Sequence, residues 1–205
     1  VSKINQLTHR NMTIKHLLTM TSGVTFNEAG SVTEMDWVKC FLESAVLKEP
    51  GTSFQYNSMN TYMLACAIKQ ITGQGLVDYL KPRLFEPLGI SNFFWETCPM
   101  GNEKGGWGLY ILPEDIAKIG QLVLDGGKFE GKQLVSEQWI AEATRAQAQP
   151  PKTLGNYDYG YQTWVGRNER SFLFNGMFGQ YVVGYFDSNI LLVSNAGTNE
   201  LFQQR

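Results

Sequence analysis

The chain has 205 residues, of which 43% are hydrophobic and 18% charged, a balance typical of globular proteins and unlike disordered, collagen-like or coiled-coil chains. The formal net charge is −2, and lysines and arginines are spread along the chain, so no basic surface for a nucleic-acid partner is expected. No apolar run reaches the length of a membrane span.

Cysteines and histidines are too few and too scattered to indicate a metal site or a disulfide framework. Cys40, Cys66 and Cys98 lie far apart without C-x-x-C spacing, and His9 and His16 do not form an H-E-x-x-H motif. We therefore expect no metal and no cofactor.

Apolar residues at helical spacing predict helices through the first 150 residues. A Gly-rich stretch, residues 99 to 111, is expected to be a loop. The expected helices are residues 13 to 21, 33 to 47 with Thr33 as N-cap, 58 to 72, 76 to 84, one from Pro113 to the Gly126-Gly127 pair, and one capped by Ser136.

The periodicity changes at about Tyr159. The runs YGYQTWVG, FLFNG, QYVVGYF and ILLVSN are short, rich in β-branched and aromatic residues, and separated by turn residues; the last three indicate a meander. Helices first and strands last, without βαβ alternation, predict an α+β fold. We expect one domain over residues 1–205, mainly a helical lobe over 1–150 beside antiparallel strands over 151–205.

The sharpest local feature is PGTSFQYNS, residues 50 to 58, which leads directly into the predicted helix 58 to 72. It would place the phenol of Tyr56 near a helix N-terminus, where backbone N–H groups point outward. A phenol can act as a base at neutral pH if a neighbouring cation lowers its pKa. The alternative is that Asn57 or Ser58 caps the helix and Tyr56 is a packing residue.

Four passages occur in an order known from one family. They are TIKHLLTMTSG, PGTSFQYNSMNTYMLACAIKQITGQ, GGWGLYILPEDIAKIGQLVLDGGKFEGKQLVSEQWI and FLFNGMFGQYVVGYFDSNILLVSN. From first to last they span residues 13 to 195, almost the whole chain. The sequence resembles the serine β-lactamase-like family of class C β-lactamases, penicillin-binding proteins and related esterases, which implies a β-lactamase/transpeptidase-like fold.

The resemblance also implies roles for individual residues. Tyr56 matches the tyrosine that helps to activate the nucleophile and protonates the leaving group, and Ser58 matches the third residue of the same motif, which helps to hold substrate and lysine. Asn175 and Gly176 match the motif on the strand that forms one wall of the substrate site. The backbone N–H of Met177 matches an oxyanion-hole donor.

Two departures from the family pattern affect the expected function. The residue before Asn175, usually Lys or His, is Phe174, which removes a cation that relatives use to bind the carboxylate of β-lactams. No lysine has a serine three residues before it, so the S-x-x-K motif that carries the family's nucleophile is absent. The nearest mimic runs from Cys66 to Lys69, where we expect core packing.

We expect the S-x-x-K helix to precede this stretch in a longer protein and the chain to end before its relatives do. The main hypothesis is a serine hydrolase acting on a small or peptide-like acyl substrate as an esterase, amidase or peptidase. The sequence is compatible with a cytoplasmic protein and with an exported one. A non-catalytic ligand-binding relative is the alternative, and a Cys66 thiol hydrolase a third. The isolated chain is expected to be inactive, and to self-associate through an exposed apolar groove or sheet edge.

Overall fold

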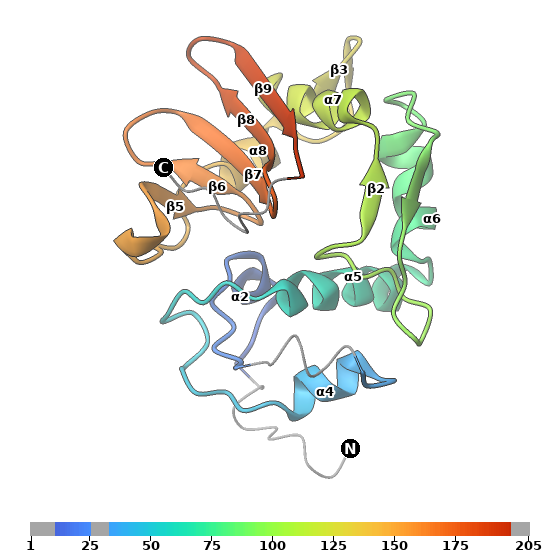
Figure 1. The fold of residues 1–205 in the computed structure, drawn as a ribbon, viewed down its shortest axis with the longest axis vertical. Coiled ribbons are helices and arrows are strands. Elements are labelled where there is room, and N and C mark those ends of the chain that lie inside the picture. Colours follow the sequence, from blue (N-terminus) through green and yellow to red (C-terminus); the bar gives the residue numbers. More distant parts are fainter. Residues whose placement is uncertain (1–10, 26–32, 198–205) are drawn as a thin grey trace. The chain divides into compact units, whose positions relative to one another are not determined.

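The computed structural model describes residues 11–25 and 33–197. The chain divides into two compact units: Val1–Pro82 with Phe94–Tyr110, and Arg83–Phe93 with Ile111–Arg205 (Figure 1). Helices and antiparallel strands are both present, as the predicted α+β class requires. The expectation of a single domain over residues 1–205 stays a prediction.

The first unit is helical and is built around α5. Its helices are α2 (Ile14–Leu18), α4 (Trp37–Glu43), α5 (Ser58–Thr72) and α6 (Leu76–Leu80). Met59 and Tyr62 of α5 are almost completely buried and pack with α2 and α4 residues in one apolar cluster. Burying side chains of this size contributes about 1.5–3 kcal/mol each. The other buried members of that cluster are Leu17, Val24, Trp37, Phe41 and Cys98.

The predicted helix over residues 33 to 47 is wrong at both ends. Asp36, not Thr33, is the N-cap, because its carboxylate accepts a hydrogen bond from the backbone N–H of Lys39 at 2.9 Å. After Ser44 the backbone leaves the helix and pairs with residues 23 to 25, with Val24 opposite Val46. A tertiary backbone pairing thus replaces the last turn that the periodicity predicted.

Helix α5 has the bounds expected from the sequence, and three other predicted segments differ. The expected helix 13 to 21 is shorter, because α2 ends at Leu18 with Thr19 as its C-cap. The expected helix 76 to 84 consists of two segments. The α-helix α6 ends at Leu80, and the chain continues in a π-helical turn, Lys81–Phe85. The expected loop over residues 99 to 111 ends in a strand, since β2 (Leu109–Ile111) pairs with β1 (Phe93–Trp95).

The second unit contains a five-stranded antiparallel sheet in the order β5-β6-β7-β8-β9. Residues 172 to 195 form the expected meander. The strands are β5 (Tyr157–Tyr159), β6 (Trp164–Gly166), β7 (Ser171–Gly176), β8 (Gln180–Tyr185) and β9 (Ile190–Asn195). The remaining elements are α7 (Pro113–Leu124), the β3 (Lys128–Phe129) and β4 (Lys132–Gln133) hairpin, α8 (Glu137–Ala143) and the 3-10 turn Lys152–Leu154.

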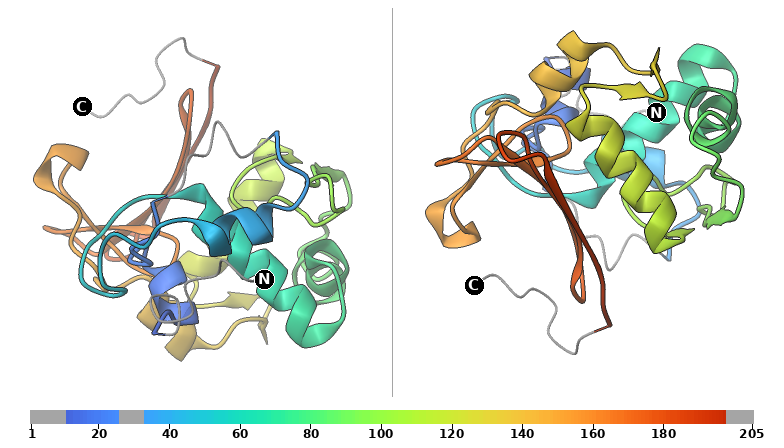
Figure 2. Two further views of the ribbon diagram at one scale, coloured as in Figure 1. Left: turned by 90° about the horizontal axis from the view of Figure 1, so that it is seen from below. Right: turned by 90° about the horizontal axis from the view of Figure 1, so that it is seen from above.

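Helix α7 packs on one face of the sheet, over β8 and β9 (Figure 2). The contact is close at Gly120, where an added Cβ would lie 2.6 Å from Cγ1 of Val182 and 3.0 Å from Cδ1 of Leu191. Glycine therefore lets the helix approach the sheet. On β9, the last strand in the order, Ile190 and Leu192 are about half exposed. Self-association through this edge stays a prediction.

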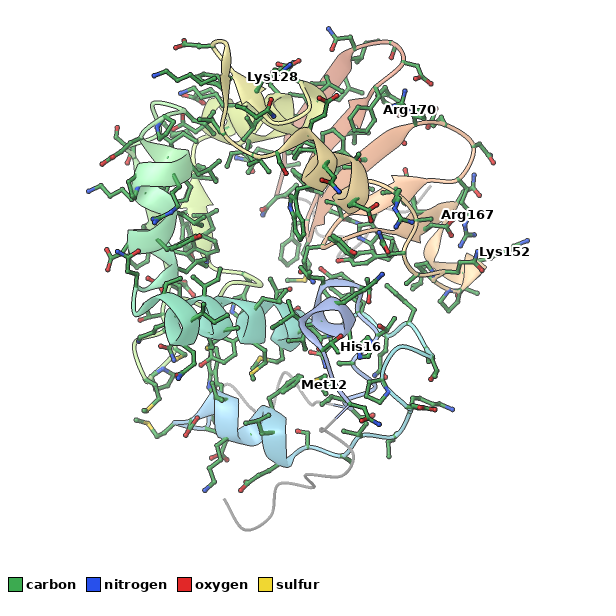
Figure 3. All side chains as sticks on the ribbon, turned by 180° about the vertical axis from the view of Figure 1, so that it is seen from behind. Met12, His16, Lys128, Lys152, Arg167 and Arg170 are labelled. Carbon is green, nitrogen blue, oxygen red and sulfur yellow. The ribbon has the colours of Figure 1, made fainter. Side chains whose placement is uncertain are left out.

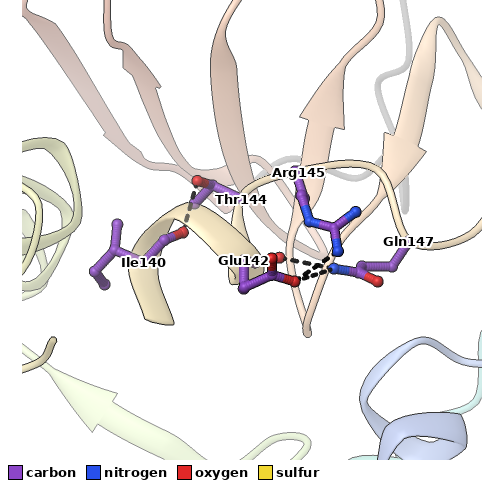
Figure 4. A network of polar contacts seen from close by, with 5 residues as sticks. All are labelled: Ile140, Glu142, Thr144, Arg145 and Gln147. Carbon is purple, nitrogen blue, oxygen red and sulfur yellow. Dashed lines mark hydrogen bonds and ion pairs between the residues drawn. The ribbon is translucent and has the colours of Figure 1, made fainter. Parts of the chain in front are cut away.

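Helix α8 begins at the predicted cap, where the Ser136 hydroxyl accepts from the backbone N–H of Trp139 at 3.2 Å. Its other end is held by side chains. Glu142 binds Arg145 at 2.7 Å and accepts from the Gln147 amide at 3.2 Å (Figure 4). These contacts fix the loop that leads into β5.

Two arginines of the turn between β6 and β7 have anionic partners. Arg167 donates to Asp158 at 2.8 Å, and Arg170 lies 3.1 Å from Asp187; Figure 3 labels both arginines. The expectation that no basic surface for a nucleic-acid partner exists stays a prediction.

We predict that Gly184→Ala will destabilise the fold. Gly184 of β8 lies opposite Phe172 of β7, and an added Cβ would overlap the buried ring of Phe172. Overpacking of this kind costs about 1–3 kcal/mol. Urea unfolding measures the loss, and Gln180→Ala on the exposed start of the same strand should change the free energy of unfolding by less than about 0.5 kcal/mol. Equal stability of Gly184→Ala and wild type would contradict the ring–backbone contact.

Candidate functional site

Tyr56 lies just outside the N-terminus of α5, with its side chain 49% exposed. The N-cap is Asn57, whose Oδ1 accepts from the backbone N–H of Met59 at 2.9 Å, and Ser58 is the first helical residue. Asn57 is 4% exposed and performs the capping that the sequence left open between Asn57 and Ser58. The phenol is therefore held beside a capped helix N-terminus without being part of the core.

A glycine pair lies against this first turn. A Cβ on Gly106 would be 2.6 Å from the backbone oxygen of Ser58, and one on Gly105 would be 3.0 Å from that of Thr61. Only residues without a side chain allow this approach. The sequence showed the segment as Gly-rich, but the spacing gave no indication that it packs on Ser58.

The first turn of α5 also holds a buried amide. Asn60 is fully buried; its Nδ2 donates to Sδ of Met20 at 3.4 Å, while its Oδ1 has no hydrogen-bond partner among the described residues. The neighbouring Thr19 and Thr21 are buried too, and their hydroxyls bond each other at 2.8 Å. Unsatisfied buried groups are rare in folded proteins, and one lies here two residues from Ser58.

Asn175 and Gly176 end β7, and Met177 begins the turn to β8. Gly176 pairs with Gln180, and the turn is completed by Phe178 and Gly179, both with positive φ. The Met177 side chain is 48% exposed. The Oδ1 atom of Asn175 is buried without a partner in the described part of the chain.

Phe174 belongs to the apolar layer beneath α7. Its ring lies 5.3 Å from that of Phe172 and packs on a cluster that includes Leu124 and Val182. An aromatic side chain therefore occupies the position where the family pattern has a cation.

The Cys66–Lys69 pair does not form an activated nucleophile. Burial raises the pKa of the Cys66 thiol, which disfavours the reactive thiolate at neutral pH. Lys69 donates instead to Oδ1 of Asn102 at 2.6 Å. These contacts support the packing interpretation of this helix face.

The structure brings Tyr56 and Ser58 together in the first unit, and Asn175, Gly176 and Met177 together in the second. Convergence of the two groups on one substrate is implied by the family resemblance and belongs to the proposal below.

His16 has a structural role in α2. Its backbone N–H donates to the Thr13 hydroxyl at 3.3 Å, and its Nδ1 accepts from the backbone N–H of Thr13 at 3.3 Å, forming a capping box (Figure 3 labels His16). His9 lies outside the described residues. Within residues 11–25 and 33–197, no cluster of three metal-ligating side chains occurs, and no helix is long and apolar enough to cross a membrane.

Comparison with known proteins gives the same fold and identifies a family. The chain is 28% identical over 125 residues to a 6-aminohexanoate-dimer hydrolase of Paenarthrobacter ureafaciens, an alignment covering 57% of this chain and 32% of that protein. Among solved structures, the penicillin binding protein of Bacillus halodurans matches with a TM-score of 0.74 and 19% identity, covering 92% of this chain and 68% of that one.

EstCE1, a hydrolase with promiscuous acyltransferase activity, matches with a TM-score of 0.77 and 15% identity, over 91% of this chain and 67% of that one. The chain spans less than half the length of the curated relatives that it matches. The model of the Beta-lactamase family matches residues 3–200. The chain therefore belongs to the Beta-lactamase family, a family of serine hydrolases.

Proposed function

We propose that the chain is part of an acyl-transferring serine hydrolase, an esterase, amidase or peptidase. Its Ser-x-x-Lys nucleophile would be carried by a part of the full-length protein outside these 205 residues. The observation that carries the proposal is the position of Tyr56, a half-exposed phenol beside the capped N-terminus of α5. The hydrolase activities named for two relatives support the reaction class.

In this proposal the serine hydroxyl attacks the substrate carbonyl, and Tyr56 exchanges the proton with the lysine and the leaving group. Ser58, at the start of α5, helps to hold substrate and lysine. The backbone N–H of Met177 stabilises the oxyanion, and Asn175 and Gly176 form the wall of the substrate site. Water then releases the acyl group and restores the serine.

Phe174 favours substrates without a carboxylate near this wall. A carboxylate transferred from water to the aromatic layer under α7 loses hydration and gains no cation in return. Neutral esters and amides do not incur that cost. We therefore propose neutral acyl substrates rather than β-lactams.

The first test compares this chain with the full-length protein that contains it, using p-nitrophenyl acetate and a chromogenic β-lactam. We expect that only the full-length protein hydrolyses the ester, and that it turns over the β-lactam more slowly than the ester. Activity of the 205-residue chain alone would place the nucleophile within it and overturn the assignment. Inactivity of both would favour a ligand-binding relative of the family.

In the full-length protein, Tyr56→Phe removes the proton-transfer group and keeps the ring. We predict a fall in kcat/KM of roughly 10²- to 10⁴-fold, the usual contribution of a general acid–base group. Tyr110→Phe is the matched control, because Tyr110 is also an exposed tyrosine of the first unit, bonded to Glu96 at 3.0 Å. Equal rates for Tyr56→Phe and the control would exclude a catalytic role for Tyr56.

Met177→Ala tests whether the backbone or the side chain acts at this position. Because the proposed oxyanion donor is a main-chain N–H, truncating the side chain leaves it in place. We predict kcat within about 3-fold of wild type, against the 10²- to 10³-fold loss typical when a donor is removed. A loss of the larger size, in a variant whose circular dichroism is unchanged, would assign the contribution to the thioether side chain.

A further inference from the structure

One residue of the first unit, Glu96, holds both ends of the loop 104–108, which carries the glycine pair. Its backbone oxygen accepts from the N–H of Lys104 at 3.0 Å, and its own N–H donates to the backbone oxygen of Gly108 at 2.9 Å. Gly108 lies so close that an added Cβ would be 2.9 Å from Cβ of Glu96. Main-chain bonds to one residue therefore fix where this loop begins and ends.

The Glu96 side chain adds a charged contact at the start of the loop. Its carboxylate forms an ion pair with Nζ of Lys104, and the two side chains are 32% and 19% exposed. The hydrogen bond from Lys104 lowers the pKa of the Glu96 carboxyl, which keeps the carboxyl ionised at neutral pH. The same Nζ atom lies 5.9 Å from the ring centroid of Trp107, within the range of a cation–π contact. Lys104 thus connects Glu96 to the middle of the loop.

The same loop contacts α5 and the apolar cluster around it. Trp107 stacks on Trp37 of that cluster, with ring centroids 5.6 Å apart. At Gly106, an added Cβ would lie 2.6 Å from the backbone oxygen of Ser58 and 3.2 Å from its Cβ. A shift of the loop therefore changes the contact with the residue at which α5 begins.

We propose that Glu96 and Lys104 are positioning residues, whose ion pair holds the loop 104–108 against the first turn of α5 and so fixes Ser58 and the neighbouring Tyr56. Both act through the contact of Gly106 with Ser58, and neither takes part in proton transfer. The catalytic consequence rests on the proposed function, whereas the holding of the loop does not.

The first test measures hydrogen exchange in the full-length protein without substrate, so its outcome is independent of hydrolase activity. Lys104→Met removes the charge and keeps an unbranched side chain of similar length. We expect the amides of the loop 104–108 and of the first turn of α5 to exchange roughly 2- to 5-fold faster, as expected for the loss of a partly exposed ion pair. Unchanged exchange in both segments would overturn the proposal.

The second test asks whether the two side chains act as one unit. In the full-length protein, Lys104→Met and Glu96→Gln should each lower kcat for ester hydrolysis by about 3-fold or more, because small displacements of positioned groups slow the reaction. The double variant should lose about as much as Lys104→Met alone, since one broken ion pair accounts for both losses. Lys104→Arg keeps the charge and should retain most of the wild-type kcat. Additive losses, or an equal loss in Lys104→Arg, would contradict the assignment.

Gly106→Ala disturbs the same contact without changing a charge. The added methyl group displaces the loop from Ser58, so we expect faster exchange in the first turn of α5 and a lower kcat, as in Lys104→Met. A Gly106→Ala variant that exchanges and reacts like wild type would show that this contact does not fix the site.

Two control variants remove other polar contacts. Tyr110→Phe removes the bond to the second carboxylate oxygen of Glu96, which comes from β2 rather than from the loop 104–108. Arg170→Met breaks an exposed ion pair of the second unit. Both should keep the wild-type exchange of the loop and the wild-type kcat, and losses as large as that of Lys104→Met in either would remove the special role of the Glu96–Lys104 pair.

The two measurements separate this inference from the proposed function. Faster exchange with unchanged kcat in Lys104→Met would overturn the link between the loop and catalysis. If the full-length protein hydrolyses no acyl substrate, the catalytic consequence fails together with the proposed function, and the exchange data still decide whether the ion pair holds the loop. If Lys104→Met impairs folding, as circular dichroism would reveal, Glu96→Gln gives the same comparison with the side-chain shape retained.

Discussion

The burial of Tyr62 organises the first unit. Its ring meets Trp37 of α4 edge-on at 5.4 Å, and its hydroxyl lies 3.4 Å from both Sγ of Cys98 and Nδ2 of Asn102. A phenol buried in an apolar cluster requires polar partners, because an unsatisfied hydroxyl costs about 1–3 kcal/mol. The ring contact joins α5 to α4, and the hydroxyl contacts join α5 to the loop after β1. Tyr56 lies just before the N-terminus of this helix.

Close backbone approaches at glycines constrain the packing within each unit. Gly120 allows α7 to contact Val182, Gly184 gives space to the ring of Phe172, and Gly106 lets a loop rest on Ser58. In each case a missing side chain allows two elements to meet, and the neighbouring apolar surfaces then pack. These glycines allow two elements to come close together. Which glycine is needed therefore depends on the residue it meets, which lies far away in the sequence.

The difference between local signals and long-range contacts explains how much of the fold could be predicted from the sequence. Helix α5, the cap at Ser136 and the β7–β9 meander were predicted correctly, because capping residues, helix stops and alternation are local signals. Helix α4 was predicted too long because the pairing of Val46 with Val24 is tertiary.

For the candidate site, the sequence identified Tyr56 beside a helix N-terminus. It did not indicate the glycine pair on Ser58, or the Oδ1 of Asn60 that has no hydrogen-bond partner in the described part of the chain. Those features arise only when distant segments fold together. The cap itself was left open between Asn57 and Ser58, because both residue types cap helices well and only the bond to Met59 distinguishes them.

Phe174 is the residue on which the proposed preference for neutral substrates rests. The strand register puts Phe174 opposite Val182, and its ring packs at a tilt against the ring of Phe172. A lysine would satisfy the register with its methylene groups and project its charge beyond them. In the proposed function, a carboxylate near the end of β7 would meet the aromatic ring of Phe174 instead of a cation. In the proposed function, a preference for neutral substrates would therefore depend on this one side chain, while the strand pairing next to Gly176 and Met177 stays as it is.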